Sequence, residues 1–303
     1  MRVLVTGVSG FSGAYIGKML AGEGHEVVGV HRRETPFLAR AAHPGLTFQR
    51  GDLIDSKQFP GPFDVVIHTA ATSPVPEVDT ARLIHDNVDG TAALIQAAAT
   101  WRCRAFIFFS SLSLYGVTEG PVIDEQTPII NPNAYGATKH LAERMLVDYA
   151  DRMPVLALRL PGVIGPGSRR NWLSNVGEKL IARQPITAFH LQAPFNNAAH
   201  VHDIGTFIVS VLDREWTGHD AIVMGARGTM PVRDVIERLA AAVGVRPIIQ
   251  EITPQKASFI LSSERAVARW GYQPTEIGAM MDRYGADLRA VDPTGAPRRD
   301  PGR

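Results

Sequence analysis

The sequence predicts an α/β protein with a doubly wound parallel sheet, followed by a smaller C-terminal α/β domain. Through about residue 165, short apolar runs alternate with stretches of helical apolar spacing. The apolar runs lack polar alternation, as expected for parallel strands that are covered on both faces. The first run, residues 2–5, leads at once into three evenly spaced glycines and a helical pattern. Repeated strand–helix units of this kind build a parallel sheet.

The glycine triplet predicts a binding site for a dinucleotide. Gly7, Gly10 and Gly13 enclose Phe11 and Ser12, and residues 14–20 continue with helical spacing. Backbone N–H groups and a helix N-terminus can approach a pyrophosphate here, because glycine carries no side chain to obstruct it. Strand, triplet and helix together favour this cradle over the alternative, a plain glycine-rich turn.

The residues after the second strand, 26–30, bear on the choice of cofactor. An acid near this position usually binds the ribose hydroxyls of NAD, whereas an arginine accommodates the 2′-phosphate of NADP. The chain has His31, Arg32, Arg33 and Glu34 here. Arg32 and Arg33 favour NADP, although Glu34 keeps NAD open. The alternative interpretation is two solvated arginines at a strand end.

Two further strand ends carry candidate cofactor contacts. The strand at 46–50 ends before Asp52 and Leu53, and Asp52 is either an acceptor for an adenine amino group or a helix cap. The strand at 64–68 runs into small residues that let the backbone pass close to a flat ligand. These small residues are Thr69, Ala70 and Ala71.

Two polar residues near these strands have open roles. We expect His68 to be a core histidine rather than a metal ligand. Asn87 lies near the start of an alanine-rich helix, 86–99, and either buried structural bonding or an active-site role fits it.

Proton-transfer chemistry is predicted by a tyrosine, a lysine and a serine. Tyr135 and Lys139 are four residues apart at the start of a predicted helix, so they share one helix face. A tyrosine has a reference pKa of about 10, and a lysine ammonium one turn away favours its phenolate. Tyr135 is therefore a candidate proton donor or acceptor at a carbinol oxygen, and Ser111, at the end of the strand 105–109, can hydrogen-bond the same oxygen. This arrangement suits hydride transfer with a nicotinamide cofactor.

The organisation of the chain changes after the loop at 161–167, where a second domain is expected. His200 and His202 alternate in this part but have no third ligand at suitable spacing, so we predict no metal site. The tail is rich in Pro, Gly and Arg without an apolar pattern, and it is predicted to be disordered. The predicted ranges are 1–165 for a dinucleotide-binding domain with returning segments near 198–225, 166–197 and 226–290 for a substrate-binding domain, and 291–303 for the tail.

Composition excludes several classes of partner. The 303 residues carry a net charge of only +1, which argues against binding to nucleic acid or to a membrane surface. No apolar stretch is long enough to span a bilayer. The single cysteine, Cys103, excludes an intrachain disulfide and fits a reducing compartment. We therefore expect a cytoplasmic protein without a cleaved leader.

Taken in order, the motifs resemble the extended short-chain dehydrogenase/reductase family, the branch of nucleotide-sugar epimerases, dehydratases and reductases. The likeness spans about residues 2–275 and rests on motif residues at matching spacing. They are Thr6-Gly7-x-x-Gly10-x-x-Gly13, Gly51-Asp52-Leu53, His68-Thr-Ala-Ala71, Asn87-Val-x-Gly-Thr91, Ser110-Ser111-x-x-x-Tyr115-Gly116 and Tyr135-x-x-x-Lys139.

The resemblance implies a Rossmann fold, a homodimer and a set of site residues. Dimers of this family usually form through two long helices, here about 83–99 and 135–150. The resemblance implies that Ser111, Tyr135 and Lys139 form the catalytic triad and that Lys139 also holds the nicotinamide ribose. It places Gly7, Gly10, Phe11, Ser12 and Gly13 on the pyrophosphate. Asp52 and Leu53 would contact the adenine, and Pro161 and Val163 would lie near the nicotinamide amide.

One departure from the family pattern bears on the substrate. Many sugar-nucleotide epimerases carry an arginine where this chain has Asn196, so the usual grip on the nucleotide diphosphate is missing, and Arg169 or Arg170 are the candidate substitutes. With the arginine pair at 32–33, we expect an NADPH-dependent reductase of a nucleotide-linked 4-keto sugar, with Tyr135 as proton donor. The alternative is a nucleotide-sugar 4-epimerase with tightly bound NAD. A non-catalytic dinucleotide-binding protein is the remaining alternative.

Overall fold

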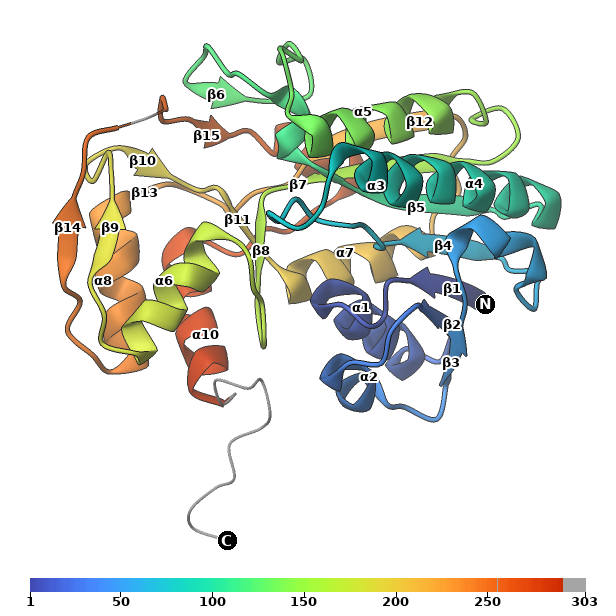
Figure 1. The fold of residues 1–303 in the computed structure, drawn as a ribbon, viewed down its shortest axis with the longest axis horizontal. Helices are drawn as coiled ribbons and strands as arrows, with labels where there is room; N and C mark the ends of the chain where they lie inside the picture. Colours follow the sequence, from blue (N-terminus) through green and yellow to red (C-terminus); the bar gives the residue numbers. More distant parts are fainter. Residues whose placement is uncertain (255, 291–303) are drawn as a thin grey trace, which may run out of the picture. The chain divides into compact units, whose positions relative to one another are not determined.

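A computed structural model describes residues 1–254 and 256–290, which form two compact units (Figure 1). The first unit contains residues 1–118, 125–160 and 205–223. The second contains residues 119–124, 161–204 and the described residues from 224 onward. The predicted disordered tail, 291–303, lies outside the described residues. No helix in the described ranges is both long enough and apolar enough to cross a membrane.

The first unit is built on a seven-stranded, fully parallel sheet with the order β12-β7-β5-β4-β1-β2-β3. The predicted doubly wound fold is therefore confirmed. The order reverses between β1 and β4, and ligands of such sheets bind at the carboxyl ends of the strands beside this switch point. The strands are β1 (Arg2–Thr6), β2 (Glu26–His31), β3 (Leu46–Arg50), β4 (Val65–His68), β5 (Ala105–Ser111), β7 (Val155–Leu160) and β12 (His219–Val223).

Helices cover both faces of this sheet. Figure 1 shows α3, α4 and α5 on one face and α1 with α7 on the other. The helices are α1 (Phe11–Gly22), α2 (Pro36–Ala41), α3 (Thr80–Ile84), α4 (Gly90–Trp101), α5 (Ala134–Val147) and α7 (Val201–Leu212). Three short helical segments are η1 (Leu53–Gln58), the π-helical η2 (His85–Asp89) and η3 (Leu112–Tyr115).

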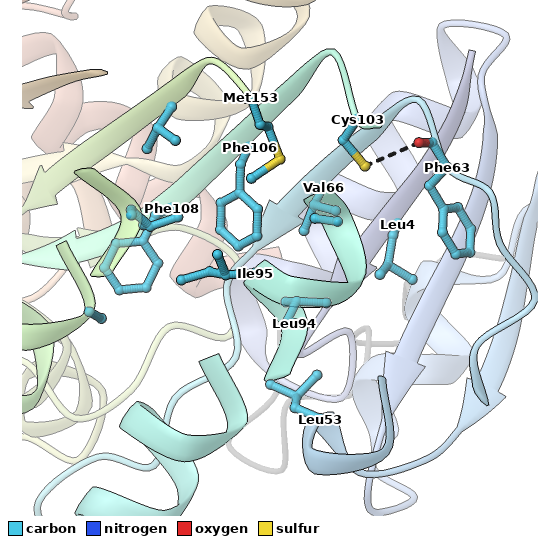
Figure 2. Close-up of a cluster of buried hydrophobic side chains, with 14 of the residues drawn as sticks. Leu4, Leu53, Phe63, Val66, Leu94, Ile95, Cys103, Phe106, Phe108 and Met153 are labelled. Carbon is cyan, nitrogen blue, oxygen red and sulfur yellow. Dashed lines mark hydrogen bonds between the residues drawn. The ribbon is translucent and has the colours of Figure 1, made fainter. Parts of the chain in front are cut away.

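The core between α4 and the sheet holds the first unit together. Leu94 and Ile95 of α4 face apolar side chains of the central strands, as Figure 2 shows. Each of these fully buried side chains stabilises the fold by about 1.5–3 kcal/mol relative to exposure. The Cys103 thiol lies in the same cluster and donates to the carbonyl oxygen of Phe63 at 3.1 Å. Burial raises the pKa of this thiol to about 12.

The second unit packs three amphipathic helices around its own apolar core. They are α6 (Trp172–Ile181), α8 (Val232–Val243) and α10 (Ile277–Ala290), and a shorter α9 spans Glu264–Trp270. The strands pair two by two: β8 (Gly162–Ile164) with β11 (Ala198–His200), β9 (Ile186–Ala188) with β14 (Ile249–Glu251), β10 (Pro194–Phe195) with β13 (Met230–Pro231), and β6 (Val122–Ile123) with β15 (Ile260–Leu261).

Two of these pairings move the predicted domain boundaries. Residues 119–124 belong to the second unit because β6 pairs with β15. Residues 161–165 belong to it because β8 pairs with β11. The segment that returns to the first unit is correspondingly shorter than predicted, 205–223 instead of 198–225.

Candidate active site

The cradle glycines allow a turn and two close approaches. Gly7 has a φ of +76°, the left-handed region that favours glycine. A Cβ at Gly13 would lie 2.4 Å from the carbonyl oxygen of Gly7, so only glycine lets α1 start this close to the end of β1. Gly10 precedes α1, and no side chain caps the helix there. The first-turn N–H groups at Phe11 and Ser12 are therefore left for a ligand.

The residues after β4 close the other side of the cradle. The Thr69 hydroxyl donates to the carbonyl oxygen of Thr6 at 2.7 Å, and the Ala70 amide donates to the Thr6 hydroxyl at 3.2 Å. A Cβ at Gly7 would come within 2.8 Å of the Ala70 backbone. Ala71, the next residue, is exposed. These contacts hold the backbone of Thr69 and Ala70 against the cradle, and its close approach to a flat ligand stays a prediction.

The start of α5 is fixed against η3 by a cap and by a glycine. The Asn133 side chain accepts from the Gly136 amide at 2.8 Å, which satisfies one of the free donors of the helix N-terminus. A Cβ at Gly136 would lie 2.0 Å from the carbonyl oxygen of Ser113. Only glycine therefore lets the first turn of α5 pack this closely on the segment after Ser111, which sets the position of Tyr135.

Ser111, Tyr135 and Lys139, named here the Ser–Tyr–Lys cluster, are brought together by β5 and α5. The hydroxyls of Ser111 and Tyr135 are hydrogen-bonded to each other. The Lys139 ammonium lies 5.9 Å from the centre of the Tyr135 ring and donates to the carbonyl oxygen of Phe109 at 2.8 Å. The spacing of Tyr135 and Lys139 had predicted their shared face, and the sheet register brings Ser111 to it.

Burial dominates the acid–base properties of this cluster. Burial raises the pKa of Tyr135 to about 12, against the opposing effect of the Ser111 hydrogen bond. Burial lowers the pKa of Lys139 to about 7, against the attraction of Glu143. The phenol is therefore protonated at neutral pH in the protein alone. A cation placed beside it, such as charged Lys139 or an oxidised nicotinamide, would favour its ionised form.

A buried ion pair lies beneath the cluster. Glu143, one turn after Lys139, is 3% exposed and binds Arg159 of β7 with a closest N···O distance of 2.7 Å. The Ser110 hydroxyl donates to the same carboxylate, and Arg159 also donates to the Tyr115 hydroxyl at 2.9 Å. Ser110 and Arg159 are register partners on β5 and β7, so the sheet presents both to α5. Glu143 was not among the residues predicted for the site, although its spacing from Lys139 places both on one helix face.

At the other end of the candidate cofactor site, Arg32 forms a two-pronged ion pair that we name the arginine clamp (Arg32, Thr72 and Asp86). Its two terminal nitrogens donate to the two carboxylate oxygens of Asp86 at 2.7 and 2.9 Å. Arg33, in contrast, is exposed, and no ion pair joins it to another described residue. The two arginines that favoured NADP therefore differ: the fork of Arg32 already has a carboxylate partner within the chain.

The remaining predicted residues of the first unit lie as follows. Asp52 accepts from the Ile54 amide at 3.3 Å, so it caps η1, and it lies 3.6 Å from Arg32. Leu53 packs into the core cluster. Asn87 has the structural bonding considered for it, since its amide bonds both backbone groups of Thr72, at 2.7 and 3.0 Å.

His68 is fully buried between two hydroxyls. Its ring nitrogens lie 2.7 Å from the Thr6 hydroxyl and 2.9 Å from the Thr91 hydroxyl. Burial, reinforced by the charge of Lys139, lowers the pKa of His68 to about 3. A neutral core histidine agrees with the interpretation reached from the sequence.

Other predicted residues belong to the second unit. Pro161 and Val163 lie there, before and within β8, and their contact with the nicotinamide stays a prediction. Asn196 is buried and bonds both backbone groups of Leu261, each at 2.8 Å. Its amide is thereby occupied by the protein itself, so the position of the usual family arginine has become structural.

His200 and His202, the two alternating histidines of this unit, have partners in the protein. The His200 ring lies 2.8 Å from the Asp287 carboxylate and accepts from the His202 amide at 3.2 Å. Across residues 1–254 and 256–290, no three or more His, Cys, Asp or Glu side chains are grouped to hold a metal ion.

The first unit therefore has the features that a nicotinamide dinucleotide needs. The cradle leaves uncapped N–H groups where a pyrophosphate binds, and a Cβ at Gly13 would clash with the Gly7 carbonyl oxygen that shapes the turn. Ser111 of the Ser–Tyr–Lys cluster is the last residue of β5, the strand next to β4 in the sheet. A doubly wound sheet with this cradle and this cluster defines a short-chain dehydrogenase/reductase of the extended type.

Comparison with known proteins gives the family. The sequence profile described as the NAD dependent epimerase/dehydratase family matches residues 3–225, most of the chain. The chain belongs to this family, and it is an NAD(P)-dependent enzyme of the extended short-chain dehydrogenase/reductase type.

Individual relatives are similar over nearly their whole length. A Streptomyces lividans protein named UDP-glucose 4-epimerase is 29% identical over 304 residues, which cover 90% of this chain and 92% of the relative. The crystal structure of a UDP-galactose 4-epimerase shares the fold with a TM-score of 0.78 at 24% identity, covering 95% of this chain and 99% of that one. UDP-glucuronic acid 4-epimerase from Bacillus cereus, solved with NAD, has a TM-score of 0.80 at 22% identity over the same shares. These relatives agree better with the alternative, a 4-epimerase with NAD, than with the NADPH-dependent reductase.

Proposed function

We propose that this chain is a UDP-sugar 4-epimerase that keeps NAD bound through its catalytic cycle. The observation that carries the enzymatic part of the proposal is the Ser111–Tyr135 hydrogen bond beside buried Lys139, on the sheet that holds the glycine cradle; a reductase would use the same residues. The full-length likeness to a protein named UDP-glucose 4-epimerase supports the substrate class. The engagement of Arg32 by Asp86 supports NAD over NADP.

The cofactor and the protein divide the chemistry. When bound, NAD would supply the hydride acceptor for C4 of the sugar and then the hydride donor for the same carbon. Tyr135 takes the proton of the 4-hydroxyl as the C4–H bond breaks, and it gives that proton back when the hydride returns to the opposite face. No oxidant or reductant is consumed over the cycle. The inverted C4 centre is the only net change.

Each residue of the cluster has a distinct task in this reaction. The Ser111 hydroxyl donates to the C4 oxygen and stabilises the charge that develops there. In its charged form, Lys139 favours the phenolate of Tyr135. Glu143 opposes the neutralisation of Lys139 that burial causes.

The proposed function is tested by the nucleotide that the purified protein carries and by its need for added cofactor. We expect near-stoichiometric NAD to be released on denaturation. We also expect UDP-glucose to be converted to UDP-galactose without added cofactor and without a net change in nicotinamide absorbance. Activity that requires added NADPH and consumes it would contradict the proposed epimerase and would support the reductase instead.

We further propose a homodimer through α3 and α5. These helices contact each other, and each exposes a large apolar side chain, Ile84 at 45% and Leu141 at 48%. Leu141→Arg should convert the dimer to a monomer in size-exclusion chromatography with light scattering. The matched change of an exposed apolar residue on α9, Val267→Arg, should leave the dimer intact. A wild-type monomer would contradict the proposal.

A further inference from the structure

The carboxylate of Asp86 is far less exposed than the arginine that it binds in the arginine clamp. Its side chain is 3% exposed, whereas that of Arg32 is 37% exposed. The Thr72 hydroxyl donates to the same carboxylate at 2.5 Å and accepts from Arg32 at 3.3 Å. Asp86 is thus a fixed acceptor, and Arg32 reaches to it from the end of β2.

Three further titratable or charged groups adjoin the clamp. Arg82 of α3 donates to Asp86 at 2.8 Å, the His85 ring lies 3.2 Å from the same carboxylate, and the Asp52 carboxylate lies 3.6 Å from Arg32. Burial alone would raise the pKa of Asp86, but hydrogen bonds from Arg32, Thr72 and Arg82 hold it well below its usual range. Asp86 is therefore ionised at every pH at which the protein would work.

The place of Arg32 makes this pairing relevant to the cofactor. Arg32 directly follows β2, where dinucleotide folds meet the 2′ position of the adenine ribose. An arginine fork binds either a carboxylate or a phosphate with its paired N–H groups, and here both terminal nitrogens already bind a carboxylate. A 2′-phosphate would also bring nearly two negative charges toward Asp52 and Asp86.

We propose that Asp86 sets the cofactor preference of this chain: by holding the fork of Arg32, it denies that arginine to a 2′-phosphate and makes the chain select NAD. The inference rests on the proposed function, in that the first unit binds a nicotinamide dinucleotide. It assigns a specificity role to a residue that lies 54 positions from Arg32 and outside the cradle.

The test is the binding of NAD and NADP to the purified chain stripped of nucleotide, measured by calorimetry without substrate. In Asp86→Asn the fork loses its ionic partner, and a charge-assisted bond to phosphate becomes available. We expect the affinity for NADP to rise by about tenfold or more and the affinity for NAD to change by less than about threefold. The double variant Asp86→Asn/Arg32→Ala should lose the gain.

Two single variants complete the experiment. Arg82→Ala removes a different partner of Asp86 and should leave the NAD-to-NADP ratio within about threefold of wild type. The single variant Arg32→Ala, which keeps Asp86, should barely change the weak affinity for NADP, because Asp86 already binds the guanidinium of Arg32 in wild type. This second result does not depend on the folding of an Asp86 variant, and a tenfold loss would overturn the inference.

The outcomes separate the inference from the proposed function. A wild-type chain that prefers NAD, with the same ratio in a folded Asp86→Asn variant, would overturn the role of Asp86 alone. A gain that persists in the double variant would do the same. A wild-type chain that prefers NADP would overturn both the clamp and the NAD-dependent proposal.

Discussion

The Ser–Tyr–Lys cluster and the arginine clamp lie on one sheet but are built differently. In the cluster, Lys139 is 3% exposed and its supporting ion pair, Glu143–Arg159, is buried as well. In the clamp, a buried carboxylate is paired with an arginine that remains one-third exposed. A buried charge must keep its partner, because leaving it unpaired costs several kcal/mol. A partly exposed arginine can instead exchange a carboxylate of the protein for an acidic group of a ligand. The cluster is therefore suited to chemistry and the clamp to selection.

The largest expected effect would come from the phenol of the cluster. Tyr135→Phe removes the proton carrier but keeps the ring and its packing, so turnover should fall by about 10²-fold or more. Binding of NAD should be nearly unchanged. Tyr149→Phe, which removes a phenol beyond the end of α5, should keep wild-type turnover. Full activity in Tyr135→Phe would remove this residue from the mechanism.

The buried ion pair beneath the cluster predicts the largest effect on stability. Glu143→Gln leaves Arg159 buried without a counter-charge, and it should lower the free energy of unfolding by about 3–5 kcal/mol. The same change at an exposed pair, Glu26→Gln opposite Arg2, should cost less than about 1 kcal/mol. Urea denaturation gives both values. Equal losses would show that burial does not distinguish the two kinds of ion pair.

The titration of Lys139 sharpens the same contrast. Its pKa is about 7 in the folded chain and higher in the unfolded one, so between these values the unfolded state binds the extra proton. Stability contributed at this site therefore rises with pH, by up to about 1.4 kcal/mol per pH unit. The difference in unfolding free energy between wild type and Lys139→Met should grow in favour of wild type from pH 7 to 9. For the exposed Lys57→Met variant, the difference in unfolding free energy from wild type should not change between pH 7 and 9. The same result for Lys139→Met would contradict the lowered pKa of buried Lys139.

The cradle predicts the smallest of these effects on stability. Gly13→Ala forces a Cβ against the Gly7 carbonyl and should cost about 1–3 kcal/mol, with a loss of NAD affinity. Gly22 ends the same helix and has open space around it. Gly22→Ala should stabilise the chain by up to about 1 kcal/mol and leave NAD binding unchanged. Thermal unfolding and calorimetry measure the pair, and similar effects of both changes would contradict the tight packing of the cradle.

The sequence predicted the features that depend on local spacing. The parallel sheet follows from strand–helix alternation, and the shared face of Tyr135 and Lys139 follows from their separation of four residues. The same rule would have found Glu143, which continues that face. The pairing of Arg32 with Asp86 was not predictable, because it joins the end of β2 to η2, 54 positions further along the chain. Residues at the ends of separate elements become partners only when the strand order and register are known, and the two arginines therefore suggested NADP.

The most direct test of the central claim follows a label on the reacting carbon. UDP-glucose carrying deuterium at C4 is incubated with the purified protein, without added cofactor, and the product is examined by NMR. Removal of hydride and its return to the same carbon predict UDP-galactose with the deuterium still at C4. Loss of the label to solvent or its transfer to another carbon would contradict the account.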